Sequence, residues 1–79
     1  MLTEKEFYTL RTIAFESGSI TQRELVEATG YSLGTINKIV NSFIGKEYID
    51  SEYKLMQKGQ SILESFKVRN AIILAAGMT

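Results

Sequence analysis

A cluster of hydroxyl, amide and ammonium side chains falls at helical spacing near the middle of the chain. Thr35, Asn37, Lys38 and Asn41 share one face of a helix predicted over Leu33–Lys46. The opposite face is apolar and carries Ile36, Ile39, Val40 and Phe43. Asparagine amides pair with adenine, and a lysine ammonium binds guanine or a phosphate. The polar face can therefore contact bases and phosphates, although a solvated face without a partner would have the same composition.

Catalysis and metal binding have few candidate groups in this sequence. The 79 residues include no cysteine and no histidine, which excludes disulfides, thiolate ligands and the commonest general base. Glu24 and Glu27 are three residues apart and could mimic a paired acid site, but a helix-capping role already explains Glu24. We predict no catalytic residue, no metal site and no cofactor for this chain.

Two helices joined by a tight turn must position the polar face. Thr21 begins the first helix, and Glu24 follows at the spacing of a reciprocal capping box. Gly30 stands where a helix ends in a left-handed residue, a conformation that glycine adopts without steric cost. Ser32 then caps the helix over Leu33–Lys46. The pattern predicts a helix-turn-helix whose second helix presents its polar side outward.

Further helices are predicted on both sides of this pair. Thr3 and Glu6 form another capping box, which begins a helix over Glu4–Glu16. A last helix over Gln57–Phe66 has one apolar face. Between them, alternating side chains predict a β-hairpin, with strands at residues 48–50 and 53–56 around a two-residue connection.

Residues 3–66 resemble the winged helix-turn-helix regulators of the MarR-like class, in which a capped S-x-x-T-[VI] opening leads into an apolar-periodic helix. Here Ser32, Thr35 and Ile36 supply that opening. The resemblance implies a mainly α fold over residues 1–67, with a three-helix core, a C-terminal helix and a wing sheet of two or three strands, to which Ile20 adds a short strand. It implies a homodimer that binds double-stranded DNA through Ser32, Leu33, Gly34, Thr35, Asn37, Lys38, Asn41 and Lys54.

Three features depart from this class, and the neutral charge and the acidic wing tip among them favour a second interpretation, as does the character of the last residues. The nine basic and nine acidic residues cancel, whereas DNA-binding modules are usually basic. The wing tip carries Asp50 and Glu52 beside a single Lys54, and Glu47 stands where relatives commonly have glycine. With Leu33 at the leading edge of the central helix, the alternative is a winged helix that docks on, or dimerises, an attached domain without binding DNA.

The last residues have a different character. Ala71–Thr79 reads AIILAAGMT, an unbroken apolar run that ends in glycine and is typical of a buried parallel strand entering a loop. It resembles the opening of nucleotidyltransferases that activate sugars or phosphocholine, and the choline-phosphate cytidylyltransferases in particular. The resemblance implies that residues 68–79 are a linker and the truncated start of a transferase domain, with an incomplete nucleotide loop at Leu74, Ala75, Ala76 and Gly77. The alternative is an apolar tail.

The sequence also bears on where in the cell the protein is located. No apolar run approaches the roughly 20 residues that span a bilayer. The first residues, MLTEKEF, lack the basic-then-apolar layout of a secretion signal. We expect a cytoplasmic protein that has no membrane partner.

Overall fold

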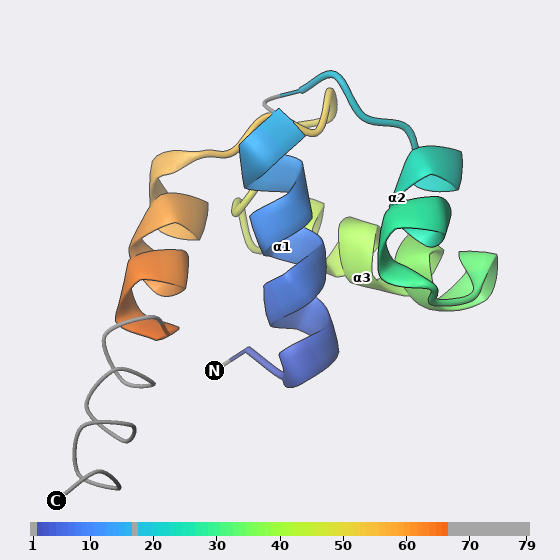
Figure 1. Cartoon of the computed structure of the whole chain (residues 1–79). Coiled ribbons are helices and arrows are strands. Elements are labelled where there is room, and N and C mark those ends of the chain that lie inside the picture. The colour runs from blue at the N-terminus through green and yellow to red at the C-terminus, as the bar shows by residue number, and fades with distance from the viewer. Residues whose placement is uncertain (1, 17, 67–79) are drawn as a thin grey trace, which may run out of the picture.

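The computed structural model describes residues 2–16 and 18–66, which form a group of short packed helices (Figure 1). In chain order these are α1 (Glu4–Glu16), α2 (Gln22–Thr29), α3 (Leu33–Gly45) and a helical segment at residues 57–66. α1 stands in the middle, with α2 and α3 on one side and the 57–66 helix on the other. The predicted linker and nucleotide loop at residues 68–79 lie outside the described residues.

α1 begins through the residues that the sequence indicates. The backbone N–H of Thr3 donates to Glu6 Oε1 at 2.9 Å, and the N–H of Glu6 donates to Thr3 Oγ1 at 3.2 Å. This reciprocal pair satisfies two N–H groups that the helix itself leaves without partners. After the helix, Gly18 has a φ of 84°, a left-handed conformation that turns the chain toward α2.

The apolar core draws on every described helix. α1 contributes Leu10 and Ile13, α2 contributes Leu25, and the 57–66 helix contributes Leu63, all of them buried. Among the described residues, the largest fully buried side chain is Phe43 of α3. Burial of one such side chain stabilises the fold by about 1.5–3 kcal/mol, so packing, and not helix propensity, fixes the orientation of α3.

The predicted wing sheet is wrong for the described residues. Between α3 and residue 57 the backbone forms one isolated antiparallel bridge, Ile49 with Leu55, and no named strand. Asp50 explains why pairing stops there, because its Oδ1 accepts the N–H groups of Glu52 at 2.9 Å and Lys54 at 3.0 Å. Tyr53, with φ 63°, further interrupts the extended backbone. We therefore call residues 49–55 the wing turn.

The short strand predicted at Ile20 is also absent from the described backbone. Ile20 is instead a core residue with 9% exposure, directly before the N-cap of α2. Its side chain is anchored by packing, and a one-bridge turn has no open strand edge with which it could pair. The expectation of a third strand failed because it depended on a hairpin longer than the one that forms.

The 57–66 helix packs closely against the rest of the molecule. A Cβ placed on Gly59 would stand 2.2 Å from the carbonyl oxygen of Tyr48, so only glycine allows this approach. At the other end, the rings of Phe66 and Phe7 stack with their centroids 4.2 Å apart and their planes 18° from parallel. These contacts confirm the predicted inward face of this helix and fix it against α1.

Candidate nucleic-acid interface

The outer face of α3 is open to solvent, as the sequence predicts. Asn37, Lys38 and Asn41 are exposed. The four apolar residues of the inner face are between 0% and 9% exposed: Ile36, Ile39, Val40 and Phe43. α3 ends at Gly45, one residue before the predicted boundary. Because the core holds one side of this helix, its polar side is rigidly presented to any partner.

The turn before α3 has the predicted geometry. Thr21 and Glu24 form the capping box of α2, in which Glu24 N–H donates to Thr21 Oγ1 at 3.2 Å and Thr21 N–H donates to Glu24 Oε1 at 3.1 Å. Gly30 has φ 76°, and its N–H donates to the carbonyl of Val26 at 2.8 Å. This left-handed glycine ends α2 and turns the chain into α3.

The first turn of α3 holds four of the predicted contact residues, which differ in their surroundings. Ser32 Oγ accepts the N–H of Thr35 at 3.2 Å and donates to Thr35 Oγ1 at 2.9 Å, so both hydroxyls already serve the helix cap. Leu33 is 58% exposed, and no atom lies within 4 Å of a Cβ built on Gly34. Leu33 and Gly34 are thus free of such a capping role, whereas the hydroxyls of Ser32 and Thr35 are engaged in it.

A chain of hydrogen bonds crosses from the outer face of α3 to the wing turn. Asn41 Nδ2 donates to Asn37 Oδ1 at 3.2 Å, and Asn37 Nδ2 donates to Gln22 Oε1 at 3.4 Å. Gln22 Nε2 in turn donates to the hydroxyl of Tyr53 at 2.8 Å. Sequence analysis identified neither Gln22 nor Tyr53 as a neighbour of α3. No spacing rule could have paired them, because 31 residues separate Gln22 from Tyr53.

Another residue that sequence analysis missed is Lys5. A groove of about 390 Å³ runs between the start of α1 and α3, and both Lys5 and Lys38 line it, together with Thr35. The Nζ atom of Lys5 lies 5.4 Å from the ring centroid of Tyr31, a cation–π contact that holds this ammonium near the turn before α3. α1 therefore adds a positive charge beside the predicted site, and Glu6, which lines the same groove, adds a negative one.

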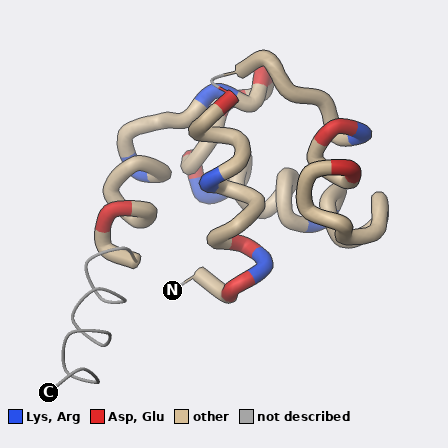
Figure 2. The backbone as a smooth tube through the Cα atoms, in the orientation of Figure 1, with Lys and Arg blue, Asp and Glu red and all other residues tan. Residues whose placement is uncertain are grey.

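Lys54 is not joined to the α3 residues. Its ammonium pairs with Glu52 at 3.8 Å, and its aliphatic stem lies against Gly18, where a Cβ would be 2.6 Å from Lys54 Cγ. Within residues 2–16 and 18–66, the other ion pair joins Lys58 to Glu47 at 3.5 Å, so neither Arg23 nor Lys38 is neutralised by such a pair. Figure 2 shows basic and acidic residues interspersed along the backbone.

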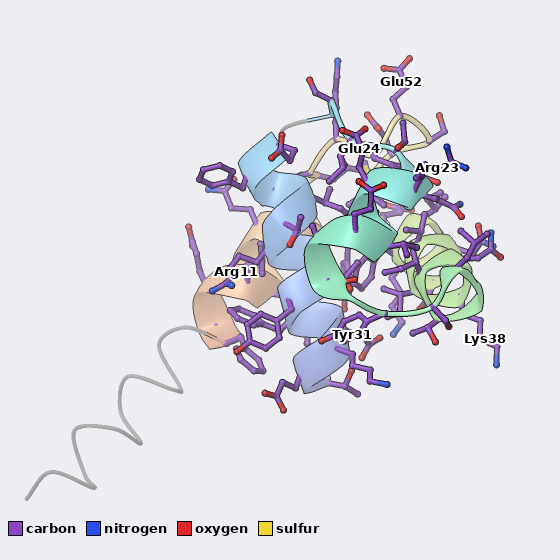
Figure 3. All side chains as sticks on the ribbon, turned by 45° about the vertical axis from the view of Figure 1, so that its right-hand side comes forward. Arg11, Arg23, Glu24, Tyr31, Lys38 and Glu52 are labelled. Atoms are coloured by element: carbon purple, nitrogen blue, oxygen red, sulfur yellow. The ribbon has the colours of Figure 1, made fainter. Side chains whose placement is uncertain are left out.

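The positive side chains nonetheless differ in position. Figure 3 shows Arg23 and Lys38 on the side of the molecule formed by α2 and α3, with Arg11 on the other side of α1. Arg11 lies over the rings of Tyr8, at 4.9 Å, and Phe7, at 5.6 Å. It is thus held away from the predicted interface, whereas Arg23 and Lys38 flank it.

Other kinds of site find no support in the described residues. No group of three or more acidic, histidine or cysteine side chains gathers there in a way that could hold a metal ion. None of the helices described combines the length and the apolarity needed to traverse a bilayer. The incomplete nucleotide loop predicted at Leu74, Ala75, Ala76 and Gly77 lies beyond the described part of the chain.

Capped helices around a left-handed glycine, with the second helix half buried and half presented, define a helix-turn-helix domain. The model of the MarR family matches residues 2–52, which include α1, α2 and α3. The chain belongs to the MarR family, whose helix-turn-helix domains are non-catalytic modules that bind DNA and often dimerise. Neither the curated proteins nor the solved structures compared with the chain gave a match.

Proposed function

We propose that this domain is the DNA-reading part of a transcription regulator, with α3 lying in the major groove. The observation that carries the proposal is the exposure of Asn37, Lys38 and Asn41 on a helix whose other side is locked in the core. Two amides and an ammonium can read base edges there, and Leu33 can contact a thymine methyl. Family membership supports the same conclusion.

The charges around α3 are mixed: Glu6 lines the same groove as Lys5 and Lys38, and Glu24 shares α2 with Arg23, but α3 itself carries only a positive charge. α3 has a single charged residue, Lys38, and no acidic group that would repel phosphates. Lys5 and Arg23 lie on neighbouring elements. If these three cations reach phosphates, log K should fall with log salt with a slope of about −3 for each protomer, and a homodimer would double it.

An electrophoretic mobility shift with duplex from upstream of the gene tests the proposal. We call the surface formed by Asn37, Lys38 and Asn41 the reading face of α3. Lys38→Glu should abolish the shift, since it places a carboxylate at the centre of this face. Arg11→Glu makes the same change in charge on the other side of α1 and should leave at least half of the binding. Circular dichroism must show both variants folded. Binding by folded Lys38→Glu at the wild-type level would refute the proposal.

Docking on a protein is the second candidate function. Leu33 is 58% exposed at the leading edge of α3, and Glu52 is exposed at the wing turn, where the resemblance to the MarR-like class implies basic residues. Under this alternative the domain binds or dimerises an attached transferase domain. The same mobility shift distinguishes the two functions, because a docking module would shift no DNA and would be indifferent to Lys38→Glu.

The transferase connection is a separate proposal, which the AIILAAGMT motif supports. We propose that a choline-phosphate cytidylyltransferase-like domain follows this one and that the two act in one chain. The residues that follow Thr79 in the parent protein test it. A serine and arginine immediately after Thr79, with a lysine about ten positions later, would complete the family's triphosphate site. The absence of these residues would refute the proposed transferase domain.

A further inference from the structure

We propose that Gln22 and Tyr53 are positioning residues that determine which base pair Asn37 prefers. Neither side chain belongs to α3, yet the two complete a continuous chain of hydrogen bonds that ends on its outer face. The inference rests on the proposed function, because it specifies how the reading face of α3 obtains its selectivity. We refer to Tyr53, Gln22, Asn37 and Asn41 as the polar relay.

The relay joins three elements that meet at the predicted interface. Tyr53 comes from the wing turn, Gln22 is the first residue of α2, and Asn37 and Asn41 are one helical turn apart on α3. The contact from Gln22 to Tyr53 is the shortest of the relay, at 2.8 Å, and both of these residues are partly buried. The relay is therefore shortest and most buried at the end away from the outer face of α3.

A carboxamide on an exposed helix can rotate, and rotation exchanges its donor and its acceptor. Asn37 uses one N–H to contact Gln22 and one oxygen lone pair to accept from Asn41. Because an amide group has two N–H donors and two acceptor positions, one of each remains for a base. Asn37 fixed in this orientation presents a defined pattern, whereas an Asn37 free to rotate would accept more than one base pair.

The backbone conformation of Tyr53 supports a functional role for its hydroxyl group. Tyr53 has φ 63°, in the left-handed region that bulky residues rarely occupy. Glycine would relieve that strain but would remove the hydroxyl that Gln22 contacts. Residues held in such conformations concentrate at functional sites, where the surrounding structure maintains them. The fold thus tolerates a strained tyrosine at the position from which its hydroxyl reaches Gln22.

Position 22 allows the relay to be altered in two ways. Gln22→Leu removes every polar contact of the side chain. Gln22→Glu keeps an acceptor for Asn37 and can accept the Tyr53 O–H through its other oxygen, so it preserves the orientation of Asn37 while adding a negative charge. If the relay determines selectivity, Gln22→Glu should bind all DNA more weakly but keep the base preference. Gln22→Leu should lose the preference.

Selection from a random duplex library, followed by binding to the enriched site with each base pair changed singly, is the decisive measurement. Tyr53→Phe and Gln22→Leu should reduce discrimination at one or two adjacent base pairs by about two- to tenfold, the range that the net contribution of one hydrogen bond allows. Affinity for unrelated duplex should stay within twofold. Tyr48→Phe is the matched control, since the Tyr48 hydroxyl makes no hydrogen bond to a described residue.

A second measurement needs no DNA. In the free protein, Tyr53→Phe should shift the side-chain amide resonances of Gln22 and Asn37, and Tyr48→Phe should leave them in place. Unchanged resonances with Tyr53→Phe would show that no relay exists in solution and would overturn the inference. So would an enriched site at which Tyr53→Phe and Gln22→Leu discriminate as well as wild type. Failure of the wild-type protein to enrich any sequence would overturn the proposed function itself, and this inference with it.

Discussion

At two positions in this small domain, 47 and 59, the presence or absence of a side chain should affect the stability of the fold. Glu47 has φ 61°, a left-handed conformation that glycine adopts without steric cost, which agrees with the glycine that the resemblance to the MarR-like class implies near this position. Gly59 is the converse case, because its backbone conformation is ordinary and the space around it is not. The sequence showed that glycine was missing at position 47, but the close approach at Gly59 depends on a carbonyl eleven residues away and cannot be read from spacing.

Glu47→Gly should be more stable than Glu47→Ala by about 1 kcal/mol, since alanine keeps the left-handed strain that glycine relieves. Both variants lose the exposed ion pair with Lys58, so the comparison cancels that contribution. Urea unfolding followed by circular dichroism measures the difference. Equal stability of the two variants would mean that position 47 carries no conformational strain in solution.

Gly59→Ala should destabilise the domain by about 2–3 kcal/mol, the cost of forcing a methyl group into a packed site. The new Cβ would meet the Tyr48 carbonyl oxygen, a backbone atom that cannot rotate away. Gly34→Ala is the control, because its Cβ meets open space and alanine favours a helix by about 1 kcal/mol over glycine. Thermal unfolding should therefore show the two substitutions acting in opposite directions. A Gly59→Ala variant as stable as wild type would refute the packing described for the 57–66 helix.

At the level of elements, local signals predicted the helices well and the wing poorly. The boxes at Thr3 and Thr21 and the cap at Ser32 depend on residues within one turn, so a sequence pattern contains all the information that they need. The wing depended on alternation over a few residues. Asp50 overrode that alternation by accepting the backbone N–H of Lys54, which could otherwise have joined a ladder, together with the N–H of Glu52 in the turn.

The residues around the reading face likewise fall into those that the sequence predicted and those that it could not. Periodicity alone predicted that Asn37, Lys38 and Asn41 would face outward, because the apolar side of α3 had to enter the core. Lys5 and Gln22 could not be found, since they approach α3 from other helices through the tertiary fold. Lys54 was included by analogy with a longer wing; in the structure its aliphatic stem lies against Gly18 and its exposed ammonium pairs with Glu52, and its contact with DNA stays a prediction.

The 57–66 helix lacks an N-terminal cap, and supplying one should stabilise it. The N–H of Gln60 bonds to the carbonyl of Met56, which places Met56 at the N-cap with no side-chain oxygen to offer. Met56→Thr should raise stability over Met56→Val by about 1 kcal/mol, because the two side chains match in shape and differ in the capping hydroxyl. Chemical unfolding of both variants gives the difference directly. A valine variant equal to the threonine variant would place the start of this helix elsewhere.

For the whole molecule, neutrality is the property that most constrains binding. Nine positive and nine negative side chains give no long-range attraction to a polyanion, so affinity must come from the local arrangement around α3. Each acidic residue near that surface should therefore reduce the affinity for DNA noticeably. Glu52 is the clearest example, because it pairs with Lys54 at the wing turn and occupies the ammonium that would otherwise face a phosphate.

Glu52→Gln should therefore strengthen DNA binding by about two- to fivefold at low salt, by removing one repulsive charge and releasing Lys54. The gain should fade as salt rises, because the Debye length shrinks from about 10 Å at 0.1 M to about 3 Å at 1 M. Glu64→Gln makes the same change in net charge on the 57–66 helix, and its effect should be smaller. Fluorescence anisotropy over a salt series measures both variants. Equal gains from the two substitutions would mean that DNA responds to the total charge of the domain and not to a surface around α3 and the wing turn, which would weaken the case for a defined groove-reading face.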